Sequence, residues 1–328
     1  MAAGDGPVKV GRVSVVVPVK DDRRVEACLA SLREATPEGV GVQVVVVDNG
    51  SSEAFQRWLV DVAGGFARVL REPRPGAYAA RNRGVAAADG EVVFFTDADC
   101  VVRPGWFEAG LGLIGEGYDI VQGYSGATGG GRIQRLLQAR YERRLRRLRY
   151  GAPTETDTRN LAVRRAVFSQ LVFNERYRRV GDTEFGLRAE QLGYRVGYAP
   201  TMRVDHDHDD DLRVFAAKQV CHGWGAQRLM EEVPGIRWHG GHLRLVAQLT
   251  GLVRRLPGRG VAARMLRFLA LAGAGGLQRG AGALPWPVAY GALTVVDKVG
   301  LLAGHLSYRG GEPEPSPSEL LGRRLLRD

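Results

Sequence analysis

The chain has 328 residues, of which 45% are hydrophobic and 25% are charged. This is the composition of an ordinary folded protein, and it excludes a mostly disordered or collagen-like chain. A chain of this length corresponds to about two domains. The formal net charge of +10 first suggests nucleic acid, anionic membranes or phosphorylated ligands. However, the basic excess is concentrated in Arg132–Arg149 and in residues 216–328, and the remainder is slightly acidic.

The cysteines and the apolar segments bear on the compartment. Cys28, Cys100 and Cys221 lie far apart without CxxC spacing, which argues against a disulfide framework or a zinc site. No basic segment followed by an apolar core marks a secretory signal. The most apolar stretch, Leu284–Gly304, is interrupted by prolines and charges, which disfavours a spanning helix. We expect a cytoplasmic protein, and the Arg, Gly and Ala bias is typical of a GC-rich bacterial genome.

Strands and helices alternate in the first part of the chain. Short β-branched and aromatic runs predict strands, and apolar residues at helical spacing predict helices. Strands are expected over residues 13–19, 42–47, 67–70 and 91–96, and helices over 24–35, 53–63 and 76–89. This alternation indicates a parallel α/β sheet, and the unbroken apolar strands indicate that helices cover both of its faces.

The ends of the four expected strands carry polar, acidic or Gly/Pro-rich residues. These ends are Pro18–Asp22, Asp48–Ser52, Arg71–Gly76 and Asp97–Asp99. Ligands of parallel sheets bind beyond the carboxyl ends of the strands. We therefore expect one binding site where these four segments meet.

Asp97 and Asp99 are the strongest chemical signal at these ends. Two carboxylates separated by one residue can share a divalent cation such as Mg²⁺ or Mn²⁺, together with the phosphates that it binds. An isolated pair of this kind is more often a solvated turn. The apolar strand before the pair and the second acidic strand end at Asp48 favour the metal-binding interpretation.

The second half of the chain is expected to be mixed and then mainly helical. Arg132–Arg149 has helical spacing with one basic face. The pattern further predicts a helix over 180–193, strands over 194–199 and 202–206, and a helix over 212–229. Gly, Ala, Leu and Arg dominate the end of the chain, and the run EPEPSPS near residues 310–318 is typical of a disordered segment.

Four motifs, taken in order, resemble those of family 2 glycosyltransferases with the GT-A fold. They are VSVVVPVKDD, VVVVDNGSS, RPGAYAARNRGVAAADGEVVFFTDADC and VGDTEFGLR. The resemblance covers about residues 11–215. It implies a GT-A domain over residues 1–230, with a Rossmann-like, mostly parallel central sheet flanked by helices. Residues 231–328 would then form a mainly helical extension.

The resemblance implies where the nucleotide of a sugar donor binds. The base and ribose would lie against Pro18, Val19 and Asp22. Asp48 matches the acid that contacts the nucleobase, since a carboxylate can accept a hydrogen bond from a uracil or guanine N–H. Arg81 matches the basic residue beside the diphosphate. For Pro18 and Asp48 the alternative is a purely structural turn.

The same resemblance extends the donor site to three further residues. Asp97 would contact the ribose or a metal-bound water, with Ala98 next to it in the same turn. Asn160 lies in TRNLAVRR, a segment similar to the family's donor-sugar loop.

The metal, Mn²⁺ or Mg²⁺, would be bound by Asp99. A histidine shortly after the last strand is a metal ligand in several proteins of this fold, and His206 is the first candidate here. Imidazole is a suitable ligand for Mn²⁺. His208 lies on the same side of an extended segment and is the second candidate.

Asp182 is the expected catalytic base. VGDTEF resembles the family's Glu-Asp pair at a helix start, with Asp182 on the Asp and Gly181 in place of the Glu. Inverting transfer needs a carboxylate that takes the proton of the acceptor hydroxyl as its oxygen attacks the anomeric carbon. Glu184 is a candidate second catalytic carboxylate, or a negative charge favoured in the first turn of a helix.

We therefore expect a metal-assisted, inverting, hexosyltransferase-like enzyme. Its donor would be a nucleoside-diphosphate sugar, UDP-linked in the family's commonest case. Its acceptor would be a hydroxyl of a glycan, a lipid-linked carrier or a small metabolite. For the C-terminal region the alternatives are peripheral contact with the inner face of the membrane, a homodimer interface and an ordinary helical subdomain.

Three other functions are less well supported. The absence of a Glu before Asp182 leaves open a sugar-nucleotide-binding protein without transferase activity. A nucleotidyltransferase of similar sheet architecture would carry a Gly-rich, basic signature where this chain has VPVKDD. A nucleic-acid-binding protein would agree with the net charge, but no binding motif is present, and we expect no nucleic-acid partner.

Overall fold

The structure, a computed structural model, describes residues 10–148, 156–207, 211–233, 259–308 and 312–321. The chain divides into two compact units. The sheet unit comprises Met1–Thr128, Arg146–Glu175 and Gly181–Asp207, and the helical unit comprises Gly129–Leu145, Arg176–Val180 and His208–Asp328. The helix predicted over residues 212–229 therefore belongs to the helical unit.

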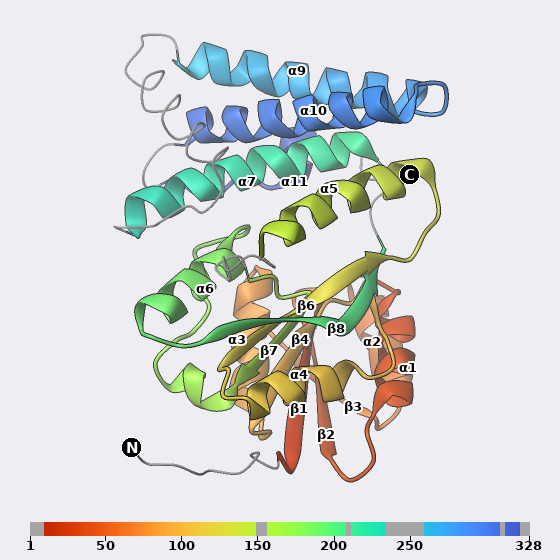
Figure 1. Cartoon of the computed structure of the whole chain (residues 1–328), viewed down its shortest axis with the longest axis vertical. Helices are drawn as coiled ribbons and strands as arrows, with labels where there is room; N and C mark the ends of the chain where they lie inside the picture. Colours follow the sequence, from red (N-terminus) through yellow and green to blue (C-terminus); the bar gives the residue numbers. More distant parts are fainter. Residues whose placement is uncertain (1–9, 149–155, 208–210, 234–258, 309–311, 322–328) are drawn as a thin grey trace. The chain divides into compact units, whose positions relative to one another are not determined.

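Eight strands form one sheet in the sheet unit, in the order β3-β2-β1-β4-β7-β6-β8-β5 (Figure 1). They are β1 (Arg12–Val19), β2 (Gly41–Asp48), β3 (Ala67–Arg71), β4 (Val92–Thr96), β5 (Cys100–Val102), β6 (Ile120–Ala127), β7 (Asn160–Arg164) and β8 (Val196–His206). β7 is antiparallel to β4 and β6, and β5 is antiparallel to β8, whereas the other pairs are parallel. The predicted α/β class with a mostly parallel sheet is confirmed.

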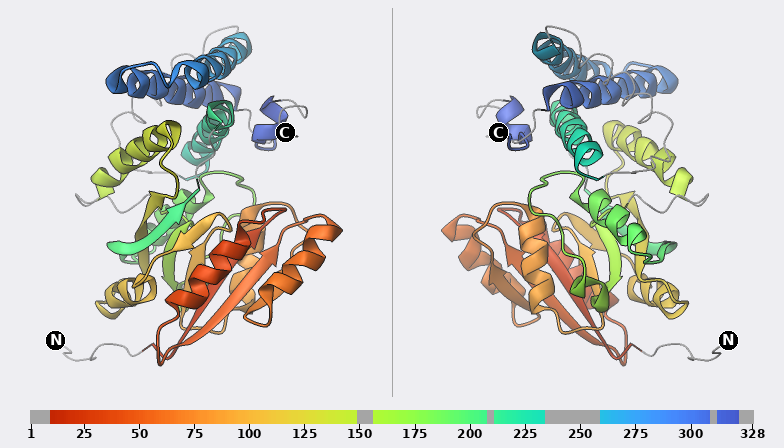
Figure 2. Two further views of the ribbon diagram at one scale, coloured as in Figure 1. Left: turned by 90° about the vertical axis from the view of Figure 1, so that its right-hand side faces the viewer. Right: turned by 90° about the vertical axis from the view of Figure 1, so that its left-hand side faces the viewer.

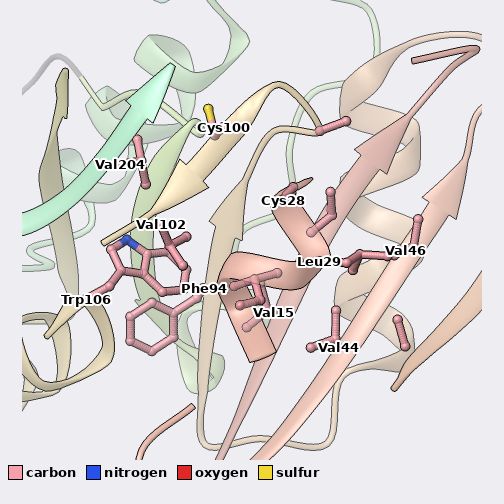
Figure 3. Close-up of a cluster of buried hydrophobic side chains, with 14 of the residues drawn as sticks. Val15, Cys28, Leu29, Val44, Val46, Phe94, Cys100, Val102, Trp106 and Val204 are labelled. Carbon is pink, nitrogen blue, oxygen red and sulfur yellow. The ribbon is translucent and has the colours of Figure 1, made fainter. Parts of the chain in front are cut away.

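Helices cover both faces of the sheet (Figure 2). One face carries α1 (Val25–Ala35), α2 (Glu53–Ala63) and α4 (Trp106–Gly115), and the other carries α3 (Ala77–Ala87) and α6 (Gly181–Gln191). Successive side chains of a strand point to opposite faces. Phe94 accordingly packs 4.8 Å from Trp106 in the core drawn in Figure 3, whereas Phe95 packs 5.4 Å from Phe173 on the other face.

The predicted elements of the sheet unit lie within two residues of the observed ones. α2 begins after Ser52, whose hydroxyl accepts a hydrogen bond from the Phe55 N–H. The two strands expected over residues 194–206 are one strand, because β8 follows β6 through a register shift between Gly123 and Tyr124. β5, β6, β7 and α4 lie in segments where the sequence pattern predicts no element.

The helical unit contains most of α5 (Arg132–Leu148), together with α7 (Leu212–Glu232), α9 (Arg259–Gly280), α10 (Trp286–Ser307) and α11 (Pro317–Leu321). α10 packs against both α7 and α9 (Figure 1). A Cβ atom on Gly304 of α10 would lie only 1.9 Å from the carbonyl oxygen of Val220 on α7, so the two backbones are in direct contact. The mainly helical character predicted for the C-terminal region is confirmed.

Of the Pro-rich run near residues 310–318, the structure describes residues 312–318. Glu314 is only 2% exposed, and its carboxylate accepts the backbone N–H of Arg178 at 2.7 Å. The composition of this run favours solvation, but one buried, hydrogen-bonded side chain fixes it within the helical unit.

Candidate functional site

The carboxyl ends of β1, β2 and β4 meet at one edge of the sheet. β1 pairs in parallel with both neighbours, and Val19 at its end lies opposite Asp48 at the end of β2. Asp21 joins the two ends, since its carboxylate accepts from the backbone N–H and hydroxyl of Ser52 at 2.9 and 2.8 Å. The sheet therefore brings together the acidic strand ends expected from the sequence.

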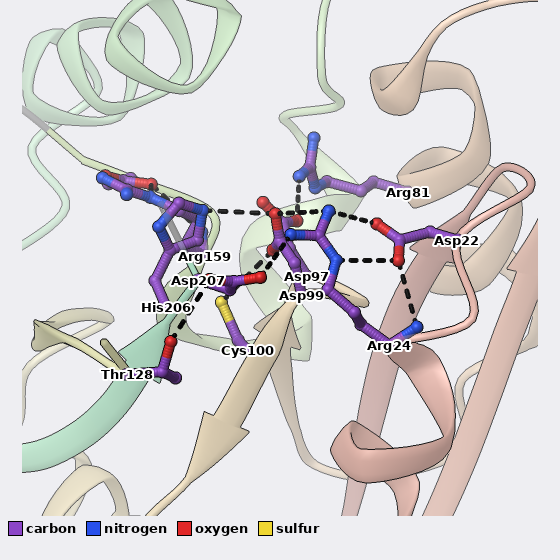
Figure 4. A network of polar contacts seen from close by, with 11 residues as sticks. Asp22, Arg24, Arg81, Asp97, Asp99, Cys100, Thr128, Arg159, His206 and Asp207 are labelled. Atoms are coloured by element: carbon purple, nitrogen blue, oxygen red, sulfur yellow. Dashed lines mark hydrogen bonds and ion pairs between the residues drawn. The ribbon is translucent and has the colours of Figure 1, made fainter. Parts of the chain in front are cut away.

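Arg24 lies among these acids, at the start of α1 (Figure 4). Its guanidinium donates to Asp22 at 2.7 and 2.9 Å and to Asp207 at 2.9 Å, and it lies 3.8 Å from Asp99. These contacts, the hydrogen bond to Asp22 first, raise the pKa of Arg24. One cation thus connects three carboxylates, and local sequence does not indicate this role because Arg24 lies in a run of charged residues.

Asp99 and His206 form the second contact of the cluster. The Nε2 atom of His206 is 3.2 Å from an Asp99 oxygen, because β5 pairs with β8 and sets Cys100 opposite His206. Burial raises the pKa of Asp99, but the hydrogen bond from His206 and the charges of Arg24 and Arg159 outweigh it and hold that pKa well below its usual range. Asp99 is therefore ionised over the whole physiological range.

The donors at this point fit a hard divalent cation. Carboxylate oxygen and imidazole nitrogen are both ligands of Mn²⁺. Among the described residues, no group of three or more His, Cys, Asp or Glu side chains converges on one point. A cation held by Asp99 and His206 would therefore complete its coordination with phosphate oxygens and water. His208 lies outside the described residues.

A second chain of contacts joins Asp97 to the start of α6. Arg81, 5% exposed, donates to Asp97 at 2.6 Å, and its guanidinium carbon lies 5.3 Å from the ring centre of Tyr78. The Tyr78 hydroxyl accepts the backbone N–H of Asp182 at 3.0 Å and donates to the Asp182 carboxylate at 3.3 Å. Asp182 is thus linked to Asp97 through two side chains of α3.

Gly181 accounts for the departure from the family's Glu-Asp pair. A Cβ atom at this position would lie 2.5 Å from Cε2 of Tyr78. The aromatic ring therefore occupies the space that any longer side chain would need. The same ring carries the hydroxyl that holds Asp182.

Asp48 combines a turn with an open hydrogen-bonding position. One carboxylate oxygen accepts the backbone N–H of Ser51 at 3.0 Å, as in an Asx-turn. The other oxygen is buried and has no hydrogen-bond partner among the described residues. Leaving a buried carboxylate oxygen unpaired costs free energy, so a bound N–H donor would be stabilising here. Val19 is buried beside it, and Pro18 is half-buried.

Two expected site residues are engaged elsewhere. Both Glu184 oxygens accept from Arg188 of the same helix, at 2.7 and 2.8 Å, in a pair whose carboxylate is buried. Asn160 is fully buried, accepts from the Trp106 indole at 2.8 Å and donates to two backbone carbonyls. Their hydrogen-bonding groups are used within the protein, so we leave both out of the proposed machinery. Ala98 is buried between its two aspartates.

Known proteins that this chain resembles in sequence include glycosyltransferases. Residues 14–172 match the model of Glycosyl transferase family 2. The chain is 27% identical over 199 residues to glycosyltransferase AglE of Haloferax volcanii, covering 57% of this chain and 64% of the relative. It is 28% identical over 244 residues to the pre-mycofactocin glycosyltransferase of Mycobacterium tuberculosis, covering 68% and 48%. The chain thus spans about half to two-thirds of the length of these relatives.

Solved structures show the same fold. The mannosyltransferase PcManGT from Pyrobaculum calidifontis, in complex with GDP-Man and Mn²⁺, superposes with a TM-score of 0.60 at 18% identity, covering 92% of this chain and 88% of that one. Glucosyl-3-phosphoglycerate synthase from Mycobacterium tuberculosis superposes with a TM-score of 0.51 at 22% identity, covering 70% and 82%. Residues 14–172 therefore resemble family 2 glycosyltransferases, and the fold of the chain is that of GT-A glycosyltransferases.

Proposed function

We propose that the protein is an inverting, metal-assisted glycosyltransferase that moves a hexose from a nucleoside-diphosphate sugar to an acceptor hydroxyl. The family match over residues 14–172 supports sugar transfer. The observation that carries the residue assignment is the meeting of Asp48, Asp97 and Asp99 at adjacent strand ends, with one Asp48 oxygen buried and unpaired.

The nucleobase binds at Asp48 in this proposal. The unpaired carboxylate oxygen accepts the N3–H of a uracil, and Pro18 and Val19 supply the apolar wall beside the ring. Asp22, held by Arg24, lies next to the ribose. A guanine N–H would also satisfy Asp48, and the structural relative PcManGT holds GDP-Man. We favour a UDP-linked donor because UDP is the commonest case in the family.

The diphosphate lies between Arg81 and the pair Asp99–His206. Asp99 and His206 would hold Mn²⁺ or Mg²⁺, and Mn²⁺ accompanies the donor in the relative PcManGT. When bound, such an ion neutralises charge that develops on the departing nucleoside diphosphate. Arg81 adds a buried positive charge, whose Nε has no partner among the described residues. A group that stabilises developing charge in a buried site acts strongly because water does not screen it.

Asp182 is the base. Its carboxylate takes the proton of the acceptor hydroxyl, while that oxygen bonds to the anomeric carbon and the bond from this carbon to the diphosphate oxygen breaks. Tyr78 and the backbone N–H of Thr183 hold one Asp182 oxygen at 3.3 and 2.9 Å and so orient the group. The acceptor is a hydroxyl on a glycan, a lipid-linked carrier or a small molecule.

Calorimetric titration of UDP-, GDP- and dTDP-sugars in the presence of Mn²⁺ tests the donor assignment. We expect one nucleotide to bind most tightly, and Asp99→Ala to weaken that binding on the order of tenfold to a hundredfold. Asp48→Asn should reduce the discrimination between bases, since its amide both donates and accepts. Equal affinities in the wild type and in Asp99→Ala would refute the assignment of the site.

A sugar-nucleotide-binding protein without transferase activity is the second candidate. The observation that favours it is Gly181 in place of an acid beside Asp182. Release of nucleoside diphosphate from the bound donor, with water as a slow acceptor, separates the two functions. Tight donor binding without any release, under conditions that also include acceptor mixtures, would favour the second.

A further inference from the structure

The surface of α9 is reversed relative to that of an ordinary soluble helix. Its large apolar side chains Val261, Met265, Phe268 and Leu269 are exposed, Met265 to 62% and Phe268 to 68%. Its buried side faces the core of the helical unit with mostly small residues, namely Ala263, Ala270, Ala274 and Leu277. A helix that faces water normally buries its large apolar residues and exposes polar ones.

The exposed apolar side chains of the molecule are concentrated on two helices. Of the ten large apolar residues that are exposed in the described part of the chain, seven lie on α9 and α10. Those of α10 are Trp286, Val288 and Val295. Isolated exposed apolar residues are ordinary, whereas a concentration of them on neighbouring elements marks an interaction surface. We call these seven residues the hairpin surface.

The charge of the hairpin surface identifies its partner. α9 contains four arginines, Arg259, Arg264, Arg267 and Arg279, and neither Asp nor Glu. Arg264 and Arg267 lie on α9 directly beside Met265 and Phe268. Asp297, the single acid of α9 and α10, is buried against Arg140 at 2.6 Å and Lys298 at 2.9 Å. Apolar side chains bordered by arginines, without acids, complement anionic lipid headgroups above an apolar layer.

A second copy of this chain would fit the hairpin surface poorly. A two-fold interface brings the same residues of both copies together. The arginines of α9 would then face their own copies, and α9 and α10 expose no carboxylate to pair with them. Repulsion between like charges therefore opposes this dimer, whereas it favours an anionic surface.

We propose that α9 and α10 form a peripheral docking surface for an anionic lipid bilayer. Met265 and Phe268 insert below the headgroups, Trp286 lies at the boundary, and Arg264 and Arg267 contact lipid phosphates. Among the helices that the structure describes, one, Gly260–Gly280, is long and apolar enough to cross a membrane by length and composition. However, its alanine side packs against α10, and two arginines lie within its first half, so it lies in the plane of the interface.

Vesicle sedimentation with the full chain tests this proposal. Vesicles with a third of their lipid as phosphatidylglycerol should sediment the protein, and pure phosphatidylcholine vesicles should do so much less. The variant Met265→Glu/Phe268→Glu should lower the partition coefficient on the order of a hundredfold, because it removes two apolar contacts and adds two repelled charges. Val60→Glu is the matched control, because Val60 is 60% exposed on α2, and it should stay within about twofold of wild type.

Four results would overturn the proposal. The wild type could fail to sediment with anionic vesicles, or the double Glu variant could sediment as well as the wild type. Velocity sedimentation without lipid could show a wild-type dimer that the same variant breaks, which would make this surface a self-interface. Resistance to alkaline carbonate extraction would indicate a spanning helix. Donor binding measured without lipid is independent of all four, so a failure here is distinguishable from a failure of the proposed transferase site.

Discussion

The sheet unit buries its apolar side chains and gathers carboxylates at one edge of its sheet, whereas α9 and α10 expose large apolar side chains beside arginines. In the first, the proposed chemistry depends on acids that neighbouring cations hold in place, as Arg24 holds Asp22 and Asp207. In the second, the residues whose exposure is unfavourable in water are the ones available for contact. The net charge of +10 therefore describes neither region, and each must be understood from its own local balance.

The proposed function places the chemical step in the sheet unit, and the largest expected effect tests this proposal directly. Asp182→Asn should lower the rate of nucleoside-diphosphate release on the order of 10²- to 10⁴-fold, because an amide cannot take the acceptor proton. Donor affinity measured by calorimetry should be unchanged. Glu184→Gln is the matched control on the same helix turn. It should reduce stability more than rate, since Glu184 pairs with Arg188. Equal rate losses in both variants would contradict the distinct roles.

The helical unit should show its own pH dependence through Glu314. Burial raises the pKa of Glu314 to about 7, although backbone N–H groups of Arg178 and Arg179 oppose the shift, whereas a glutamate in the unfolded chain titrates near 4.5. Between these values only the folded state keeps the proton, so the free energy of unfolding falls as pH rises, by on the order of 3 kcal/mol in total. Urea denaturation between pH 4 and pH 8 measures this fall.

Glu314→Gln should remove that part of the pH dependence, because a glutamine does not titrate. Glu312→Gln, an exposed neighbour in the same run, should leave it in place. If Glu314→Gln followed the wild-type curve, the stability of the helical unit would not be linked to this carboxyl group.

The contact between Gly181 and Tyr78 predicts a smaller effect. Gly181→Ala should destabilise the sheet unit by about 1–3 kcal/mol, because the added Cβ would lie 2.5 Å from the Tyr78 ring. It should also slow transfer, since the displaced ring carries the hydroxyl that holds Asp182. In a Tyr78→Ala background the same change should cost less, as the ring is absent. Thermal denaturation of the four proteins of this cycle measures the coupling, and additive effects would argue against the contact.

The smallest predicted effect concerns the basic border of the hairpin surface. Arg264→Gln/Arg267→Gln should weaken binding to anionic vesicles by about thirtyfold, since each of the two basic residues near such a surface contributes about 1 kcal/mol. The loss should shrink in high salt, which screens these charges. An effect that is equally large on zwitterionic vesicles would mean that the arginines act through packing.

Several elements of the sheet unit follow from local sequence. α2 occupies its predicted residues because its cap and its apolar spacing agree. α4 was missed because WFEAGLGLIG contains three glycines, which disfavour an isolated helix, and the element is stabilised by burial of Trp106 and Phe107. β5 has only three residues and is defined by its pairing with β8, which local sequence does not reveal.

The candidate site likewise has residues that local sequence predicts and residues whose role depends on tertiary contacts. The strand-end acids could be identified because parallel strands bring their carboxyl ends to one edge. The direction in which a side chain points from its helix or strand could not be predicted from the sequence. Glu184 turns toward Arg188 of its own helix instead of toward the candidate site. Asn160 uses its side-chain amide for hydrogen bonds within the core. The exposure of the large apolar side chains of α9 could not be predicted either, because an apolar composition does not tell which side of a helix faces its neighbours.

Arg24 has a consequence for the order in which ligands load. Its guanidinium already serves as the counter-ion of Asp22 and Asp207 and lies near Asp99, so a free divalent ion would have to compete with a tethered cation. A diphosphate that arrives together with the ion offers Arg24 an alternative anionic partner and so relieves the competition. Ion and nucleotide should therefore bind with positive cooperativity, because Arg24 would disfavour a free divalent ion more than an ion that arrives with the diphosphate.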